Sequence, residues 1–171
     1  MAAVVEICES NGAGETITHD ITNSNMGNSD AANLTAASNP IIPGQRSFAK
    51  YQRLHVTDMG GASKVDTIKV WRGGSLSGSD THVTNARETS YGGAATYAEP
   101  TASAVSGADQ TMPSTEPSGA NLGIGGSLSG EITSAGYSDY LVHQLVVNAG
   151  TTAGVSLTGA NGMNYKYREV A

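Results

Sequence analysis

The segments SFAKYQRLHVTD (residues 47–58) and KVDTIKVWR (residues 64–72) carry the clearest strand pattern in the chain. In the second segment Ile68 and Val70 alternate with Lys69, which is the two-residue period of a β-strand. Neither set of alternate positions in the first segment is purely apolar, which predicts a strand partly covered on both faces. The glycine-containing linker between the two segments has turn composition, so we expect them to form a β-hairpin.

Further strands are predicted where apolar or alternating residues stop at turn residues. The segments AAVVEICE (residues 2–9) and ETITHDIT (residues 15–22) are expected to pair through the SNGAG turn. Asn161-Gly162 signals a second hairpin, which leads into the closing alternation of Met163, Tyr165 and Tyr167. The other predicted strands are THVTNARE (residues 81–88), GAATYAE (residues 93–99), a Gly-rich bulged strand or strand pair at residues 122–133, and GYSDYLVHQLVV (residues 136–147).

The number of short strands and turns predicts an all-β fold. We expect a single β-sandwich, either Ig-like or jelly-roll-like, with long loops and with one domain spanning residues 1–171. Only residues 29–37, SDAANLTAA, have the composition of a short helix. Segments near 23–44 and 100–119 are rich in Pro, Asn, Ser, Thr or Ala and are predicted to be long loops or arms.

Charge and cysteine content exclude several classes of protein. The net charge is −6 and the nine Lys and Arg residues form no basic cluster, so nucleic acid is not an expected partner. No stretch reaches the roughly 20 apolar residues that span a bilayer, so a membrane is not expected either. Cys8 is the single cysteine, and we interpret it as a small buried residue of the first strand.

Residues 136–147 contain Ser138, Asp139 and His143, a set of side chains found in hydrolases. In a strand Asp139 and His143 share one face while Ser138 points to the other, so the hydroxyl could not reach the imidazole. We therefore predict no catalytic residue, and we expect these polar residues to serve a sheet.

No metal or cofactor site is predicted. The histidines show no HxH or HExxH spacing, although Asp80 and His82 would share one face of a strand. Gly123, Gly125 and Gly126 precede no helical pattern, so they are interpreted as turn or bulge residues and not as a phosphate cradle. The four histidines considered are His19, His55, His82 and His143.

Three stretches together resemble a group of small β-sandwich virion structural proteins of tailed bacteriophages. They are NPIIPGQRSFAKYQRLHVTD with VDTIKVWRGG (residues 39–58 and 65–74), SGANLGIGGSLSGEITSAGYSDYLVHQLVV (residues 118–147), and YKYRE (residues 165–169). The resemblance covers most of the chain from Asn39 onward but not the first 38 residues. It implies a non-enzymatic subunit present in many copies on a phage particle.

The resemblance therefore predicts a virion structural protein, and we favour a capsid accessory or decoration role. Its expected partners are other virion proteins and copies of itself as a homo-oligomer, and its expected location is the virion, after assembly in the host cytoplasm. Three alternatives remain open: a neck, collar or tail protein; a glycan- or receptor-binding module that uses Tyr91 and Tyr97, with Tyr137 and Tyr140 in the same region; and a hydrolase that uses His143 or His82.

Overall fold

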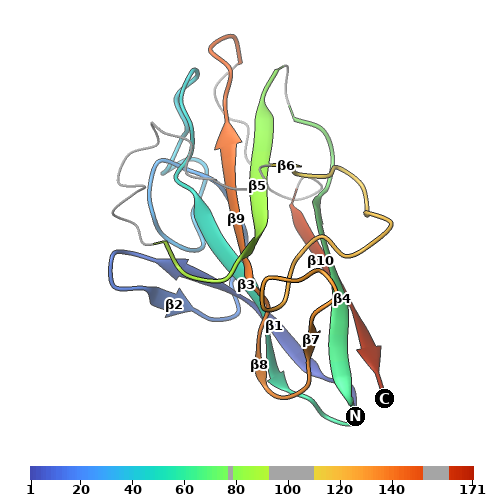
Figure 1. The fold of residues 1–171 in the computed structure, drawn as a ribbon. Coiled ribbons are helices and arrows are strands. Elements are labelled where there is room, and N and C mark those ends of the chain that lie inside the picture. The colour runs from blue at the N-terminus through green and yellow to red at the C-terminus, as the bar shows by residue number, and fades with distance from the viewer. Residues whose placement is uncertain (77–78, 93–109, 152–161) are drawn as a thin grey trace.

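The computed structural model describes residues 1–76, 79–92, 110–151 and 162–171, and within them every regular element is a β-strand (Figure 1). One antiparallel sheet has the strand order β2-β1-β3-β9-β5-β6, with β8 also paired to β3, and the other has the order β10-β4-β7. The strands are β1 Val4–Asn11, β2 Thr16–Thr18, β3 Lys50–Asp58, β4 Lys64–Arg72, β5 Thr81–Glu88, β6 Gln110–Thr111, β7 Glu131–Ile132, β8 Gly136–Tyr137, β9 Tyr140–Val146 and β10 Met163–Val170.

The predicted all-β class is confirmed, and so are most of the predicted strands. The β1–β2 hairpin forms as expected, with Asn11 opposite Thr16 and Glu9 opposite Thr18. The strand expected within residues 136–147 is present as β8 and β9, and the closing alternation forms β10. The strand predicted at 93–99 and the hairpin signal at Asn161-Gly162 lie outside or at the border of the described residues.

The predicted hairpin of residues 47–58 with 64–72 is wrong. β3 pairs with β1, β8 and β9, whereas β4 pairs with β10 and β7, so the linker between them passes from one sheet to the other. Gly60, at φ 57°, turns this linker against the N-terminus, where a Cβ would lie 2.5 Å from the carbonyl oxygens of the first two residues. A turn-like linker is compatible with a hairpin within one sheet and with a connection between two sheets. The connection between sheets is favoured because β3 and β4 then bury their apolar faces against each other.

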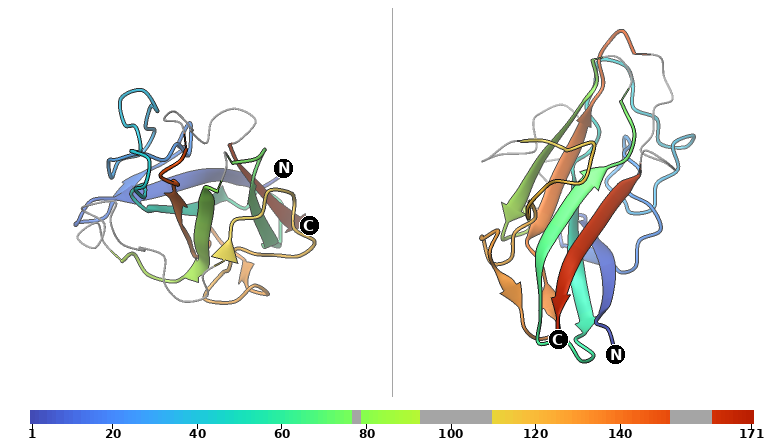
Figure 2. Two further views of the ribbon diagram at one scale, coloured as in Figure 1. Left: turned by 90° about the horizontal axis from the view of Figure 1, so that it is seen from above. Right: turned by 90° about the vertical axis from the view of Figure 1, so that its right-hand side faces the viewer.

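The two sheets share one apolar core. In the right-hand view of Figure 2, β4 and β10 lie side by side as one layer in front of strands of the larger sheet. Burial of this apolar surface is the main stabilising contribution to such a fold. Its buried members come from both sheets and include Leu54, Val56, Ala86 and Leu141 from the larger sheet and Val65, Ile68, Val70 and Ile132 from the smaller one.

The segment 23–44 covers the polar part of the larger sheet. Met26 and Leu34 are buried, and the Ser24 hydroxyl donates a hydrogen bond to the Gln52 side chain of β3. The helix expected at residues 29–37 is wrong: this stretch has only bends and turns. Asn25 donates its side-chain amide to the Leu34 carbonyl, and such side-chain bonds compete with helical backbone bonds. That the segment reaches over neighbouring subunits stays a prediction.

The second predicted arm, residues 100–119, is described only from residue 110. There Gln110–Thr111 forms the short strand β6 at the sheet edge beside β5. Met112 is buried, and the Pro113 carbonyl accepts a hydrogen bond from the Arg72 amide, so this part lies against the domain. Over the described residues, no helix is long and apolar enough to cross a membrane.

Candidate functional site

Ser138 and Asp139 lie in the connection between β8 and β9, whereas His143 lies within β9. The Ser138 hydroxyl accepts a hydrogen bond from the Leu54 amide at 3.0 Å and donates one to the Asp139 carbonyl at 2.8 Å. The Asp139 carboxylate accepts from the Gly126 amide at 2.8 Å. Burial raises the pKa of Asp139. Both side chains therefore hold loops and strands in place. Among the hydrogen bonds of the described residues, none joins Ser138 or Asp139 to His143.

His143 belongs instead to a buried chain of hydrogen bonds on the inner face of the larger sheet. Its Nε2 lies 3.1 Å from the Gln52 Oε1, and its Nδ1 lies 2.8 Å from the His82 Nε2. Because the amide oxygen can only accept, His143 carries its proton on Nε2, and His82 donates to its Nδ1. Gln52 Oε1 also accepts from the Tyr165 hydroxyl of β10, which links the two sheets.

Both imidazoles of this pair are fully buried and neutral. Burial first, and then the Arg72 charge, lower the pKa of His82 to about 3. Burial lowers the pKa of His143 well below its usual value. Asp80, which the sequence placed on the face of His82, accepts instead from the Asn148 amide and the Thr151 hydroxyl. The pair is thus a structural element of the sheet interior.

The Gly-rich stretch 122–133 contains a tight turn, as its interpretation as turn residues predicted. Gly125 and Gly126 have φ values of 62° and 80°, and they reverse the chain between Ile124 and Ser127, whose backbones bond to each other in both directions. Left-handed φ at both central positions is the reason for two consecutive glycines here.

The tyrosines proposed for glycan binding are used within the domain where the structure describes them. Tyr91 packs edge-on against Tyr51, with ring centroids 4.8 Å apart, and donates its hydroxyl to the Gly12 carbonyl. Tyr140 is buried and donates to the Glu15 carboxylate. Tyr97 lies outside the described residues.

A different group of side chains meets on the outer face of the larger sheet. Glu6 and His55 are direct partners across β1 and β3, and Cys8 follows Glu6 by two residues on the same face of β1. Thr18 ends β2 opposite Glu9, so His19 comes next in register beside Cys8. Three neighbouring strands therefore bring Glu6, Cys8, His19 and His55 together, and we name these four residues the Glu-Cys-His cluster.

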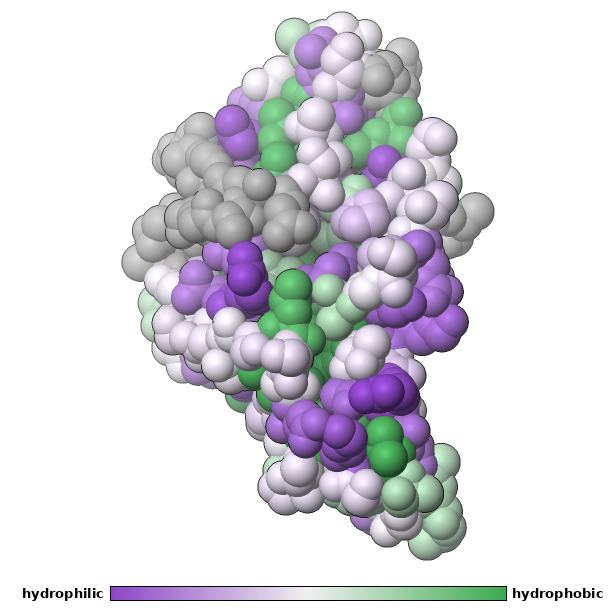
Figure 3. Space-filling model, turned by 45° about the vertical axis from the view of Figure 1, so that its right-hand side comes forward, coloured by the Kyte–Doolittle hydropathy of each residue, from purple (hydrophilic) through white to green (hydrophobic). Residues whose placement is uncertain are grey.

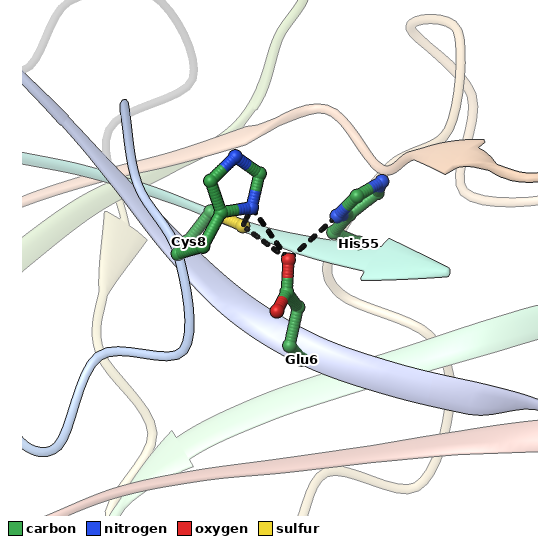
Figure 4. Close-up of side chains that lie close together, drawn as sticks. Glu6, Cys8 and His55 are labelled. Atoms are coloured by element: carbon green, nitrogen blue, oxygen red, sulfur yellow. Dashed lines mark hydrogen bonds and ion pairs between the residues drawn. The ribbon is translucent and has the colours of Figure 1, made fainter. Parts of the chain in front are cut away.

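The cluster is centred on one carboxylate oxygen. Glu6 Oε1 lies 2.6 Å from the His19 Nδ1 and 2.7 Å from the His55 Nδ1. The Cys8 Sγ lies 3.4 Å from the same oxygen and 3.3 Å from the His19 Nδ1. Figure 4 shows the Cys8 and His55 side chains directed toward the Glu6 carboxylate from neighbouring strands. One ligand atom from each of the four residues lies within 4.8 Å of all the others.

The cluster is charged and reaches the protein surface. Hydrogen bonds from His55 and His19 lower the pKa of Glu6 to about 2, so it is a carboxylate at neutral pH. Burial and the adjacent Glu6 raise the pKa of the Cys8 thiol to about 12. Cys8 is fully buried, whereas the His19 side chain is 50% exposed. Solvent and solutes can therefore reach the cluster from the side of His19.

Aromatic and cationic side chains surround one flank of the cluster. The His55 ring stacks on the Tyr137 ring of β8, with centroids 4.0 Å apart and planes 11° apart. The Arg53 guanidinium lies over the same Tyr137 ring at 3.9 Å and over the Tyr140 ring at 4.5 Å. These contacts restrict the orientation of His55, which keeps its Nδ1 directed at Glu6.

Sequence reasoning did not find this cluster. The prediction of no metal site rested on ligand spacing along the chain, and the cluster depends on strand register. Cys8 is buried as expected, and its sulfur also lies within hydrogen-bond distance of Glu6 and His19. The only local signal was Glu6 and Cys8 at alternate positions of one strand. The strand predicted at residues 15–22 included His19, whereas β2 ends at Thr18 before Asp20 turns the chain at φ 48°.

Comparison with known proteins gives this chain no relative: no protein-family model matches it, and no curated protein or solved structure is significantly similar to it.

Proposed function

We propose that this chain is a non-enzymatic structural protein of a tailed-phage virion that assembles in many copies on the particle. The proposal rests on the sequence resemblance described above and on the way the fold uses its polar residues. Ser138, His82 and His143, the best candidates for catalysis, are buried and occupied in holding strands together. Such a domain is suited to binding through its surface and its sheet edges.

The observation that carries the assembly part of the proposal is the edge strand β10. It has eight residues and, in the described part of the chain, pairs with β4 on one side only. An edge of this length offers unpaired backbone groups to another chain. Its outer side chains are hydrophilic, including Asn164 and Lys166, so a partner must match its charge. Figure 3 shows small hydrophobic groups scattered among hydrophilic ones on one face of the molecule.

Within this proposal we favour a capsid accessory or decoration role, with a neck, collar or tail position as the alternative. The partners would be other virion proteins and further copies of the chain, and assembly would take place in the host cytoplasm. Quantitative mass spectrometry of purified particles tests the proposal directly. Hundreds of copies per particle would support decoration, and about a dozen would indicate a neck or tail ring, because copy number follows particle symmetry. Absence of the chain from particles would refute the virion proposal.

The role of β10 can be tested by site-specific labelling. Cys8 is fully buried, so a cysteine at an exposed position provides a single reactive thiol. We expect Asn164→Cys on β10 to react with maleimide in the free chain and to be protected in particles. Ser134→Cys, exposed in the loop after β7 at the opposite edge of the same sheet, is the matched control and should react in both. Equal labelling of Asn164→Cys in both states would exclude the β10 edge from the interface.

A further inference from the structure

We propose that the Glu-Cys-His cluster binds one Zn²⁺ ion, which ties the end of β2 to β1 and β3. This inference is independent of the proposed virion function. It rests on four side chains of metal-binding type that three neighbouring strands place on one face of the sheet, with one ligand atom from each within 4.8 Å of the others.

The distances in the cluster are close to those of a tetrahedral zinc site. Zinc bonds of about 2.0–2.3 Å place neighbouring ligand atoms roughly 3.2–3.7 Å apart. The Cys8 sulfur already lies 3.3 Å from the His19 nitrogen and 3.4 Å from the Glu6 oxygen. The Glu6–His19 and Glu6–His55 separations, at 2.6 and 2.7 Å, must increase by roughly 0.6 Å each to admit the ion, and the pairs made with His55 by Cys8 and His19, which lie within 4.8 Å, must settle at a similar distance. Side-chain rotation of the half-exposed His19 can supply part of this movement.

The ligand chemistry selects zinc from the common cations. Calcium and magnesium take oxygen ligands, and this cluster offers one carboxylate against a sulfur and two nitrogens. A thiolate with two imidazoles and a carboxylate is a set that Zn²⁺ accepts in four-coordinate geometry. Because the chain supplies all four ligands, the site would be closed, as in structural zinc sites, and would leave no position for a reacting water.

Binding would exchange protons for the metal without any redox change. The two histidines now donate Nδ1–H to the carboxylate, so each would move its proton to Nε2 and coordinate through Nδ1. The Cys8 thiol would release its proton to solvent and bind as thiolate. The carboxylate and the thiolate together neutralise the 2+ charge. Arg53 lies opposite Cys8 in the register of β1 and β3. Its guanidinium lies over two tyrosine rings and 3.7 Å from the Glu15 carboxylate.

The position of the ion gives it a mechanical effect on the fold. β2 has three residues and lies at the sheet edge, and the chain after it covers the polar part of the sheet through residues 23–44. Beyond β2, a backbone hydrogen bond from the Ile21 amide to the Ile7 carbonyl joins this part of the chain to β1. A bond from His19 to a metal held by β1 and β3 would fasten this weak edge, so the metal should stabilise the edge more than the rest of the domain.

The test uses the full-length chain without a histidine tag. Metal-free protein is titrated with Co²⁺, and Zn²⁺ is then added in competition, with elemental analysis of the stoichiometry. We expect one metal per chain, the intense visible absorption of tetrahedral Co²⁺ with a thiolate charge-transfer band, and displacement of Co²⁺ by Zn²⁺. Hydrogen exchange should slow at residues 16–22 when Zn²⁺ is present. Octahedral Co²⁺ without the thiolate band, or fewer than one bound ion in ten chains, would overturn the proposal.

Two variants separate coordination from loss of folding. Cys8→Ser should abolish the charge-transfer band, but Cys8 is fully buried and its replacement could unfold the domain. His19→Gln changes a half-exposed side chain, so the fold should stay intact. We expect it to weaken Zn²⁺ binding by a factor of roughly 10–100. Glu131→Gln, which changes an exposed carboxylate on β7 of the other sheet, is the control and should bind Zn²⁺ like the parent. Equal affinity in His19→Gln and the parent would refute the site.

Discussion

Lowering the pH from 7 to 5 should destabilise this protein through the buried His82–His143 pair. Both pKa values are lowered in the folded chain, to about 3 for His82 and in the same direction for His143, because burial disfavours the imidazolium. In the unfolded chain a histidine takes up a proton near pH 6.5. Below that pH the unfolded state therefore binds more protons than the native state, and the free energy of unfolding falls as the pH falls.

The structure sets the size of the effect. For each imidazole that stays neutral in the native state, the free energy of unfolding falls by about 1.4 kcal/mol per pH unit once the pH is well below 6.5. Integrated from pH 7 to pH 5, the loss is about 2 kcal/mol for each histidine and about 4 kcal/mol for the pair. That is a large part of the roughly 5–15 kcal/mol that stabilises an ordinary domain.

Other shifted carboxyl groups act mainly outside this window. The lowered pKa values of Glu6 and Asp66 contribute stability above their unfolded values, and this contribution is lost only when the pH falls toward and below 4. The raised pKa of Asp139 acts in the opposite direction, because its folded form holds a proton to higher pH. The loss between pH 7 and pH 5 should therefore come from the histidine pair, and the raised pKa of Asp139 can only reduce it.

Urea unfolding at pH 7, 6 and 5 in buffers of equal ionic strength measures this dependence. The slope with urea should stay constant while the midpoint falls. His82→Gln removes one of the two groups, so its loss over the same range should shrink to about 2 kcal/mol, although its stability at pH 7 is lower. NMR titration should show both imidazoles neutral at pH 5 in the folded parent. A parent whose stability is constant from pH 7 to pH 5, or a variant with the full loss, would refute the reasoning.

Three substitutions test other parts of the fold by urea unfolding at pH 7. Leu54→Ala removes a fully buried side chain from the shared core and should cost about 2–5 kcal/mol; a cost below 1 kcal/mol would contradict the described packing. Asp66→Asn weakens the paired 2.7 Å contacts from Arg168 that join β4 to β10, and we expect a loss of roughly 1–3 kcal/mol that shrinks in an Arg168→Gln background, where the Lys64 and Thr67 contacts to Asp66 remain. Gly130→Ala would place a Cβ against the Ile124 carbonyl oxygen of the same loop and should cost about 1–3 kcal/mol of unfolding free energy. Gly119→Ala, which has open space around it, is the control and should change this free energy by less than about 0.5 kcal/mol. Equal effects of the two substitutions would show that the loop relaxes freely.

The strands were predictable because their signal is local. Alternation of apolar and polar residues fixes which side chains of one strand share a face, and this holds for most of β10. Ser138 lies between β8 and β9, outside both strands, so its facing did not follow from alternation. The mixed pattern of β3 also indicated cover on both faces, and its two faces carry the buried polar chain of Gln52 and the partly buried Glu-Cys-His cluster.

Pairing between strands was not predictable from local patterns. The linker between β3 and β4 has the composition of a hairpin turn, yet the two strands belong to different sheets, since each gains more by burying its apolar side against the other. The short helix expected at 29–37 failed for a related reason. Its backbone is held by side-chain amides and by contacts to the sheet, which a short isolated helix cannot outweigh.

The sequence by itself determined the all-β class, the turns and the facing of individual strands, because these depend on residues that are neighbours in the chain. Tertiary structure alone decided the neutral histidine pair and the Glu-Cys-His cluster. In the cluster, side chains at positions 6, 8, 19 and 55 meet only because β1 pairs with β2 and β3 in one particular register. A shift of that register by one residue would turn Glu6 and Cys8 to the opposite face, so the chemistry of this surface is a property of strand pairing.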